Sequence, residues 1–485
     1  MSGDLPTIFP ELLLAAGGML LLVLPFLRSG RLLGLITLAL LAAAFDLGLL
    51  RALGPRAAMP VSFSGMLIQD RFADFFQAAI LAAAGLVVLS VMGYAREEVR
   101  ARREFYSLLL LSTTGLLLVV RAQNLALLYL GLELVSILSY LLVGFRKKDS
   151  LSIEAALKYF LFGALSTGAM LYGISLIYGL TGSLQLSALA ALAGLATAAP
   201  GLVLVTVLLL AAGLAFKLAL VPFHMWAPDA YEGAPAPVAS FISLGPKLAG
   251  FALLARLFLV GLPVEVASWP FLFGGIAVVT MTLGNVVALS QTNVKRLLAY
   301  SSIAHAGTMA VGIAVATPFG LAAVMYYLLA YVLMNGAAFA GVIAVGNASG
   351  REDLGAFAGL SRREPALAFM ITVAFLSLAG IPPLAGFFGK MWIFGAALQA
   401  GAVGLAVVAA LNSVVALFYY IRVIKTMYID PATTSARLPR SRSLRLALAL
   451  CTISLFLLGL WQGPWLDLTA RSLPFISKPG SLPWQ

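Results

Sequence analysis

Residues 217–226 read KLALVPFHMW and interrupt one of the long apolar segments of the chain. Pro222 has no amide hydrogen and its ring clashes with the preceding helical turn, so a helix that reaches it is expected to kink or break. A second interruption occurs in residues 378–390, LAGIPPLAGFFGK, where Pro382 and Pro383 stand together. Each quoted stretch also contains a lysine. The sequence therefore predicts two broken helices, each with a charge near the break.

Hydrophobic residues make up 62% and charged residues 10% of the 485 positions, which leaves too little polar surface to cover a soluble globule. At about 1.5 Å per residue, many apolar segments are long enough to cross a bilayer as helices. We predict an all-α polytopic membrane protein, a single membrane domain over 1–485. About fourteen transmembrane helices are expected, at residues 8–27, 32–53, 73–94, 105–121, 125–145, 153–179, 201–228, 237–261, 268–290, 295–316, 319–346, 365–398, 404–428 and 443–463.

The two interruptions fall in the seventh and the twelfth expected helices, so the two segments cross the membrane in opposite directions. This arrangement is typical of inverted repeats with transport sites at the discontinuous helices. We expect helices 1–3 at residues 8–94, repeat one at 105–261, repeat two at 268–428 and a last helix at 443–463. KYFLFGALSTGAM at 158–170 also aligns weakly with YYLLAYVLMNGAA, 168 residues later. The alternative is that proline is simply common in membrane helices.

The formal charge of +12 indicates topology rather than nucleic-acid binding. Of 31 Lys and Arg residues, four lie inside apolar segments, and 20 of the other 27 fall in loops on one side if the N-terminus is outside. This positive-inside bias predicts a multi-pass protein of the bacterial plasma membrane with both termini outside, and it gives no reason to infer a nucleic-acid partner. The one cysteine, Cys451, excludes an internal disulfide and any iron–sulfur or thiolate zinc site built by this chain alone.

Five charged residues lie at membrane depth and are candidates for proton transfer, because a charge there costs about 2.5–3.5 kcal/mol. Glu133 is central in its segment and Lys217 lies beside the first break, which makes them a candidate switchable pair. A carboxylate that approaches a lysine holds the lysine charged, and one that moves away releases the proton. The alternative is a static ion pair that packs two helices.

Lys247 is close to the centre of the eighth helix, and Lys390 follows the second break. Both are predicted relay groups, with snorkelling to the membrane surface as the alternative. Lys158 lies near the start of the sixth helix, four residues after Glu154, a spacing that also suits an ordinary helix-stabilising pair.

The two histidines are further candidates, because imidazole exchanges protons near neutral pH. His224 follows Pro222 closely, and His305 is central in the tenth helix. Around His305 we expect hydroxyl groups to line a hydrated path between the lysines, from Ser301, Ser302, Thr308, Tyr326, Tyr327 and Tyr331. The alternative for each histidine is a structural hydrogen bond. The chain lacks phosphate-loop, dinucleotide-binding and zinc-protease motifs.

Three stretches carry a resemblance to a known family: LAFKLALVPFHMWAPDAYEGAPAPV at 214–238, LSQTNVKRLLAYSSIAHAG at 289–307, and SLAGIPPLAGFFGK at 377–390. They resemble the antiporter-like membrane subunits of respiratory complex I, the proton-pumping NADH:quinone oxidoreductase, which share ancestry with Mrp-type cation/proton antiporters. The resemblance covers nearly the whole chain and is greatest to the N subunit, since the length leaves no room for the lateral helix of the L subunit.

The resemblance implies a proton-translocating subunit of a translocase, with no redox centre or metal of its own. NADH, FMN, iron–sulfur clusters and quinone are then expected in partner subunits. The implied partners are other membrane subunits, including a neighbouring antiporter-like subunit and small quinone-side subunits, together with lipid. By motif, the resemblance assigns Glu133 and Lys217 to the charge pair, Lys247 to the connecting lysine and Lys390 to the terminal lysine. It also matches the two histidines, His224 and His305.

Two other functions stay open at this point. The chain could be a subunit of an Mrp-type cation/proton antiporter without redox chemistry, although a sodium site favours carboxylate and carbonyl oxygens and Glu133 is the one central acid. It could also be a structural spacer that only transmits motion.

Overall fold

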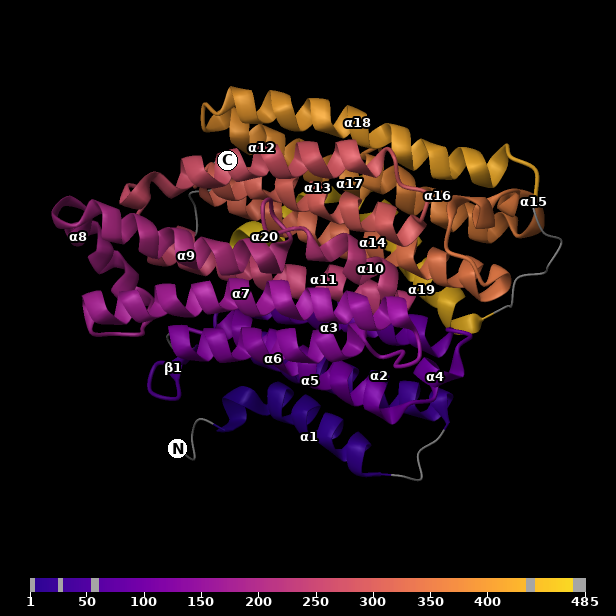
Figure 1. The fold of residues 1–485 in the computed structure, drawn as a ribbon, viewed down its shortest axis with the longest axis horizontal. Helices are drawn as coiled ribbons and strands as arrows, with labels where there is room; N and C mark the ends of the chain where they lie inside the picture. The colour runs from indigo at the N-terminus through magenta and orange to yellow at the C-terminus, as the bar shows by residue number, and fades with distance from the viewer. Residues whose placement is uncertain (1–4, 25–28, 54–60, 433–440, 474–485) are drawn as a thin grey trace.

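The computed structural model describes residues 5–24, 29–53, 61–432 and 441–473. Helices lie side by side with their long axes roughly aligned, and α1 and α18 are at opposite edges (Figure 1). The α-helices are α1 (Phe9–Val23), α2 (Gly30–Leu53), α3 (Arg71–Met92), α4 (Glu97–Arg100), α5 (Arg103–Arg121), α6 (Leu125–Val143), α7 (Ser150–Thr181), α8 (Leu192–Ala198), α9 (Pro200–Leu218), α10 (Trp226–Gly233), α11 (Ala236–Leu254), α12 (Trp269–Ala288), α13 (Val294–Ala314), α14 (Pro318–Ser349), α15 (Leu360–Arg363), α16 (Pro365–Ala379), α17 (Ala385–Gln399), α18 (Val403–Tyr428), α19 (Arg442–Leu460) and α20 (Gln462–Arg471).

Short elements connect these helices. A π-helical segment, Ala255–Gly261, continues α11. Among the described residues, two short strands, β1 (Val61–Ser62) and β2 (Leu67–Ile68), pair antiparallel. The 3-10 helices are Leu5–Ile8, Leu186–Ala191, Val266–Ser268 and Leu354–Phe357.

The prediction of an all-α polytopic membrane protein is confirmed. Thirteen helical segments in the described residues are long and apolar enough to cross a membrane. The expected helix at 365–398 is the exception, because it consists of two shorter helices, α16 and α17. Together with this broken pair, the thirteen segments correspond to the fourteen expected helices.

Both predicted breaks are confirmed. The helix α9 ends at Leu218, Ala219 takes a left-handed conformation with φ 56°, and α10 begins only at Trp226. The helix α16 ends at Ala379, before Gly380 with φ 87°. Since the prolines in these two gaps cannot donate a backbone hydrogen bond, neither helix continues across its gap, and the carbonyl groups of the last turn are free for other partners.

Side-chain caps fix where several helices begin. Asp70 accepts from the backbone of α3, Asn124 from α6, Asp149 from α7, Asn293 from α13 and Thr317 from α14. Each cap satisfies a backbone N–H that has no partner within its helix. The polar residues between apolar segments therefore set the helix ends.

The predicted repeat has a counterpart in the helix bounds. The helices α7 and α14 are both 32 residues long and start 168 residues apart, and each ends before a left-handed glycine, Gly182 or Gly350. The capping residues Asn124 and Asn293 also form similar isolated bridges, to Gln185 and Asp353 respectively. These correspondences are what the repeat predicts, and the inverted relation of the two halves stays a prediction.

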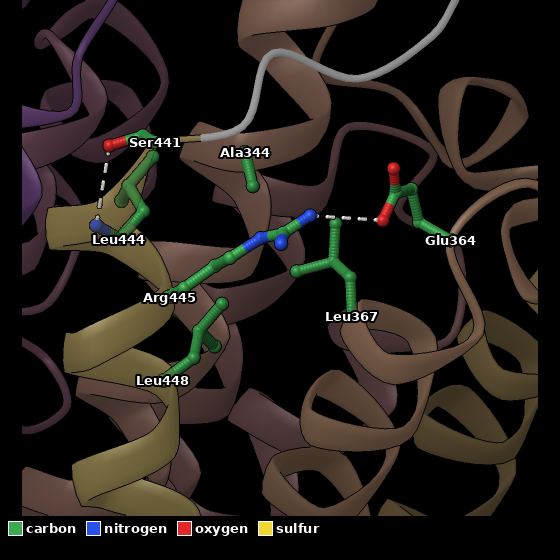
Figure 2. Close-up of a pocket in the computed structure, with 7 residues that line it drawn as sticks. All are labelled: Ala344, Glu364, Leu367, Ser441, Leu444, Arg445 and Leu448. Carbon is green, nitrogen blue, oxygen red and sulfur yellow. Dashed lines mark hydrogen bonds and ion pairs between the residues drawn. The ribbon is translucent and has the colours of Figure 1, made fainter.

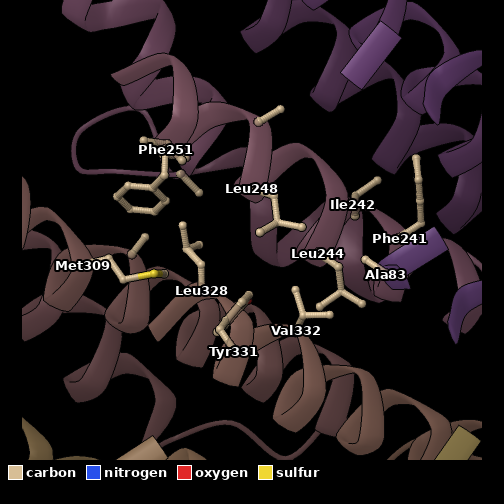
Figure 3. Packing of buried hydrophobic residues seen from close by; sticks show 14 of the residues in the cluster. Ala83, Phe241, Ile242, Leu244, Leu248, Phe251, Met309, Leu328, Tyr331 and Val332 are labelled. Carbon is tan, nitrogen blue, oxygen red and sulfur yellow. The ribbon is translucent and has the colours of Figure 1, made fainter. Parts of the chain in front are cut away.

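The centre of the bundle consists of α11, α13 and α14. The buried share of the membrane window is 100% for Ala236–Gly261, 94% for Val294–Ala314 and 83% for Pro318–Ser349. Figure 3 shows side chains of α11, among them Leu244 and Leu248, facing Leu328 and Val332 of α14. Because lipid is as apolar as these side chains, van der Waals packing rather than water exclusion holds such helices together. Lys247 of α11 and Lys295 of α13 are accordingly buried within the protein.

Candidate functional site

Lys217 lies in the last turn of α9 with 5% of its surface exposed. Its Nζ donates a hydrogen bond to Ser136 Oγ of α6 at 2.9 Å. Glu133 lies one turn before Ser136, and its buried Oε1 has no hydrogen-bond partner in the described part of the chain. In this structure Ser136, rather than the carboxylate, contacts the ammonium group, and the approach of Glu133 to Lys217 stays a prediction.

Lys217 also lies against the central helix α11. A Cβ atom placed on Gly250 would be 2.7 Å from Leu218 Cδ2 and 3.9 Å from Lys217 Cγ. Gly250 lies one turn after Lys247 on α11, and its lack of a side chain allows α9 to pack closely there.

Lys247 is buried in α11 and has no acidic partner among the described residues. Its Nζ donates to the backbone oxygen and to the hydroxyl of Ser302 of α13, both at 2.5 Å. The same Nζ lies 5.2 Å from the centre of the Tyr331 ring, a favourable cation–π distance. Hydroxyl, carbonyl and aromatic groups therefore solvate the ammonium form of Lys247.

The Ser302 hydroxyl is the centre of a buried hydrogen-bond network. Tyr331 of α14 donates to it at 2.8 Å, and the hydroxyl of Tyr231 of α10 lies 3.2 Å away. Asn335 Nδ2 donates to the Tyr331 hydroxyl and to Ser243 Oγ, each at 2.9 Å. The network therefore joins α10, α11, α13 and α14 around Lys247.

His305 of α13 belongs to a second buried network. Its Nδ1 lies 2.7 Å from the Tyr327 hydroxyl and its Nε2 lies 3.0 Å from the Tyr420 hydroxyl. The Tyr420 hydroxyl is also 2.5 Å from Ser301 Oγ. Because Ser301 and Ser302 are consecutive, the two networks meet on adjacent residues of α13.

Two residues expected beside His305 bond elsewhere. The Tyr326 hydroxyl donates to the Leu458 carbonyl of α19, and Thr308 donates to Ala304 within its own helix. Adjacent residues on a helix point about 100° apart, so Tyr326 and Tyr327 cannot both face His305. Nothing in the sequence indicated Tyr420, because it lies on α18, 115 residues after His305.

Lys390 is buried in α17, with 6% of its surface exposed. Its Nζ donates to the carbonyls of Leu378 and Ala379 at 3.2 and 2.9 Å. These are carbonyls of the last turn of α16, which the break leaves without helical partners. The broken helix therefore builds a binding site for the Lys390 ammonium group, with no acid in contact in the described residues.

His224 and Lys158 lie apart from these networks. His224 is in the gap between α9 and α10, and its buried Nδ1 has no hydrogen-bond partner within the described ranges. Lys158 is 42% exposed and pairs with Glu154 at 2.8 Å and with Asp229 of α10 at 2.9 Å. The pair with Glu154 is the helix-stabilising alternative that the spacing of four residues suggested, and the proton-relay part of Lys158 stays a prediction.

Two arginines counted as outward loop charges are in fact buried in ion pairs. Arg121 contacts Glu11 at 2.7 Å with 0% of its side chain exposed, and Arg256 contacts Asp70 at 2.8 Å with 2% exposed. Neither arginine is among the 20 basic residues expected on the inner side, and the orientation of the chain stays a prediction. The predicted topology also puts the 429–442 loop inside, but most of that loop and the chain termini are outside the described residues.

A small pocket lies between α14, the start of α16 and α19. It is lined by Ala344, Glu364, Leu367, Ser441, Leu444, Arg445 and Leu448, and Figure 2 shows Arg445 reaching across it toward Glu364. None of the candidate residues lines this pocket. Among the described residues, no cluster of three or more histidine, cysteine, aspartate or glutamate side chains could hold a metal ion.

Comparison with known proteins identifies the family. Residues 122–416 match the family described as NADH:quinone oxidoreductase/Mrp antiporter, TM. NADH-quinone oxidoreductase subunit N 2 of Sorangium cellulosum is 43% identical, over 96% of this chain and 97% of that protein. NADH-quinone oxidoreductase subunit N of Trichlorobacter lovleyi is also 43% identical, over 88% of each chain. The similarity to N subunits suggested by the three motifs is confirmed.

Solved structures agree with this assignment. A chain of respiratory complex I from Thermus thermophilus is 36% identical and superposes with a TM-score of 0.81, covering 96% of this chain and 100% of that one. A chain of the Mrp complex from Dietzia sp. DQ12-45-1b has a TM-score of 0.80 at 24% identity, over 97% of this chain and 96% of that one, which shows a shared fold alone. The chain belongs to the NADH:quinone oxidoreductase/Mrp antiporter family of membrane proteins, as an antiporter-like subunit of the complex I type.

Proposed function

We propose that this chain is a proton-translocating membrane subunit of an NADH:quinone oxidoreductase, and that protons move through it by way of buried lysines. The observation that carries the proposal is that Lys217, Lys247 and Lys390 are all buried with their amines on uncharged oxygens. A lysine without a counter-ion in a low-dielectric interior exchanges its proton far more readily than one held by a carboxylate. Electron transfer and its cofactors belong to partner subunits in this proposal.

A series of contacts supports a lateral order of transfer, from Lys217 to Lys247, then His305, then Lys390. The stem of Lys217 lies against Gly250 of the helix that carries Lys247. Ser302 contacts Lys247, and the adjacent Ser301 joins the Tyr420 and His305 network.

The last link in this order lies between α14 and α17. Tyr327, bonded to His305, packs so closely on Gly389 that a methyl group there would overlap its ring, and Lys390 is the next residue. Water molecules bridging the remaining gaps would complete the path.

Glu133, His224 and Lys158 have supporting parts in this proposal. Glu133 approaches Lys217 in one state of the switch, since its unpartnered carboxylate oxygen is one turn from Ser136. His224 lies beside the first break and exchanges protons with water there. Lys158, half-exposed beside Asp229, belongs to the entry side.

Lys247→Arg and Lys247→Ala test the proposal together. Arginine hardly releases its proton, and alanine has none to release, so both variants should lose most proton pumping per NADH oxidised in proteoliposomes. Both should still assemble, as checked on native gels. If Lys247→Arg pumps normally while Lys247→Ala fails, Lys247 is a fixed electrostatic element and the relay is wrong. Normal pumping in both variants would remove Lys247 from the path altogether.

We also propose the finer location, in a bacterial plasma membrane with both termini outside and a neighbouring antiporter-like subunit beside this chain. The exposed Lys148, between α6 and α7, should then face the cytoplasm. Because Cys451 is buried, Lys148→Cys should react with a membrane-impermeant maleimide in inside-out vesicles and stay unmodified in intact spheroplasts. Labelling in spheroplasts would reverse the proposed topology.

A further inference from the structure

The Ser302 hydroxyl uses its whole hydrogen-bonding capacity. A serine hydroxyl has one O–H donor and two acceptor lone pairs. Lys247 Nζ and the Tyr331 hydroxyl both donate to Ser302 Oγ, which fills the two lone pairs. The single proton of Ser302 is then directed at the remaining neighbour, the Tyr231 oxygen at 3.2 Å.

The direction of Tyr331 is fixed by its own neighbour. Asn335 Nδ2 donates to the Tyr331 oxygen, and an amide NH₂ group cannot accept a proton from Tyr331 in return. Tyr331 therefore keeps its proton toward Ser302. Tyr231 is the neighbour whose bond with Ser302 can run in either direction.

The charge state of Lys247 decides which direction holds. An ammonium group can only donate, so the Ser302 proton points to Tyr231 while Lys247 is charged. A neutral amine has a lone pair that accepts the Ser302 proton, and the Tyr231 hydroxyl can then donate into Ser302. Both states leave the Ser302 hydroxyl fully hydrogen-bonded, which lowers the cost of changing between them.

We propose that the Ser302 hydroxyl is the direct proton donor and acceptor for Lys247, with Tyr231 of α10 as its exchange partner, an inference that rests on the proposed proton-translocating function. In uptake, the Ser302 proton moves to the neutral Lys247 amine and the Tyr231 hydroxyl proton moves to Ser302. Tyr231 then takes a proton from a hydronium ion in the water that bridges Lys217 and α10. The net change is one proton moved from water to Lys247, with every hydroxyl restored.

Ion pairs and hydrogen bonds hold α10, and with it Tyr231, in place. Asp229 contacts Lys158 of α7 at 2.9 Å and Arg296 of α13 at 2.7 Å. Arg296 also contacts Glu232 at 2.8 Å. At the opposite end of α10, the Trp226 indole donates to the Phe216 carbonyl, in the turn that carries Lys217. A short helix fixed at both ends keeps the Tyr231 hydroxyl within reach of Ser302.

Tyr231→Phe and Ser302→Ala are the test variants, and Tyr159→Phe is a matched control. Tyr159 is a buried tyrosine that stacks on Trp226 of α10 with ring centres 4.1 Å apart, but its hydroxyl has no hydrogen-bond partner among the described residues. Ser302→Thr keeps the hydroxyl and serves as the conservative variant. Each is measured in the assembled complex as the rate of NADH-driven proton pumping, in H₂O and in D₂O.

We expect Tyr231→Phe and Ser302→Ala to pump about ten-fold more slowly, less than the loss typical of a removed acid–base group because water can replace a hydroxyl. The solvent isotope effect should rise in both, since proton transfer to Lys247 becomes the slow step. Ser302→Thr should recover most pumping, and Tyr159→Phe should match wild type.

If Tyr231→Phe and Ser302→Ala pump normally while the separate variant Lys247→Ala fails to pump, this inference is overturned and the proposed function still stands. A loss of pumping without any change in the isotope effect would assign both residues a structural part only, which also overturns it. If Ser302→Ala does not assemble, Tyr231→Phe decides by the same two measurements. Normal pumping by Lys247→Ala instead contradicts the proposed function itself.

Discussion

Gly380→Ala should disturb Lys390 through a single added methyl group. Gly380 follows α16 with φ 87°, and a Cβ atom there would stand 3.0 Å from Lys390 Cδ and 3.3 Å from Lys390 Nζ. Since both distances are shorter than ordinary van der Waals contact, the lysine side chain has to move. The movement should lengthen its hydrogen bonds to the Leu378 and Ala379 carbonyls, now 3.2 and 2.9 Å.

Two effects of different size are expected. A left-handed alanine costs about 1–2 kcal/mol, which lowers stability without touching the relay. A hydrogen bond from a charged group is worth about 1.5–3 kcal/mol. Weakening one bond by about 1.4 kcal/mol changes the ratio of charged to neutral Lys390 about ten-fold. Pumping should therefore fall by about that factor if Lys390 must hold a proton at this site.

Gly401→Ala provides the matched control. Gly401 also has a left-handed conformation, with φ 75°, but a Cβ atom there meets nothing within 4 Å. Both variants should lower the melting temperature of the purified complex by similar amounts, and only Gly380→Ala should reduce protons pumped per NADH. If the two variants pump equally well, the position of Lys390 at the broken helix does not matter for transport. That result would refute the claim that the Leu378 and Ala379 carbonyls hold the Lys390 proton for transfer.

Two further predictions concern polar contacts of the buried helices. Ser136→Ala removes the hydroxyl that accepts from Lys217 and should reduce proton pumping several-fold. The control Ser112→Ala removes a buried hydroxyl without a partner in the described residues and should pump normally. Equal pumping by both would assign no function to the Ser136 contact. Asp70→Asn keeps a good cap for α3 but leaves Arg256 uncompensated, so we expect a loss of about 3–5 kcal/mol and poor assembly on native gels. Asp353→Asn, which breaks an exposed pair with Arg351, should cost about 1 kcal/mol or less, and an equal effect of the two would contradict the buried-pair argument.

The sequence could predict the breaks and the buried lysines, because both signals are local. A proline within an apolar segment disrupts its own helix, and a charge in such a segment has few ways to reach water. The partners of those charges depend on helix rotation and on neighbours far along the chain. Ser136 lies 81 residues from Lys217, and Tyr420 lies 115 residues from His305, so no local pattern indicates either contact.

The same limit applies to two arginines at the ends of apolar segments. Arg121 and Arg256 look like loop residues at the ends of apolar segments, and their acidic partners Glu11 and Asp70 are 110 and 186 residues away in sequence. For Lys158 the sequence offered the local partner Glu154, but not Asp229, which lies 71 residues later. Composition indicates how many charges a membrane protein carries, but only packing decides which of them are neutralised.

Lys247 and Lys390 lie on either side of His305 in the proposed path and have different hydrogen-bond partners. This difference bears on the direction of proton transfer. Lys247 bonds to a hydroxyl, which can donate as well as accept, so its neutral form is also well hydrogen-bonded. Lys390 bonds to two carbonyls in this structure, which only accept, so its lone pair finds no donor there when the proton leaves. Lys247 is therefore suited to repeated exchange within a chain. Lys390 is suited to hold a proton until water arrives to take it, which places it at the end of the path.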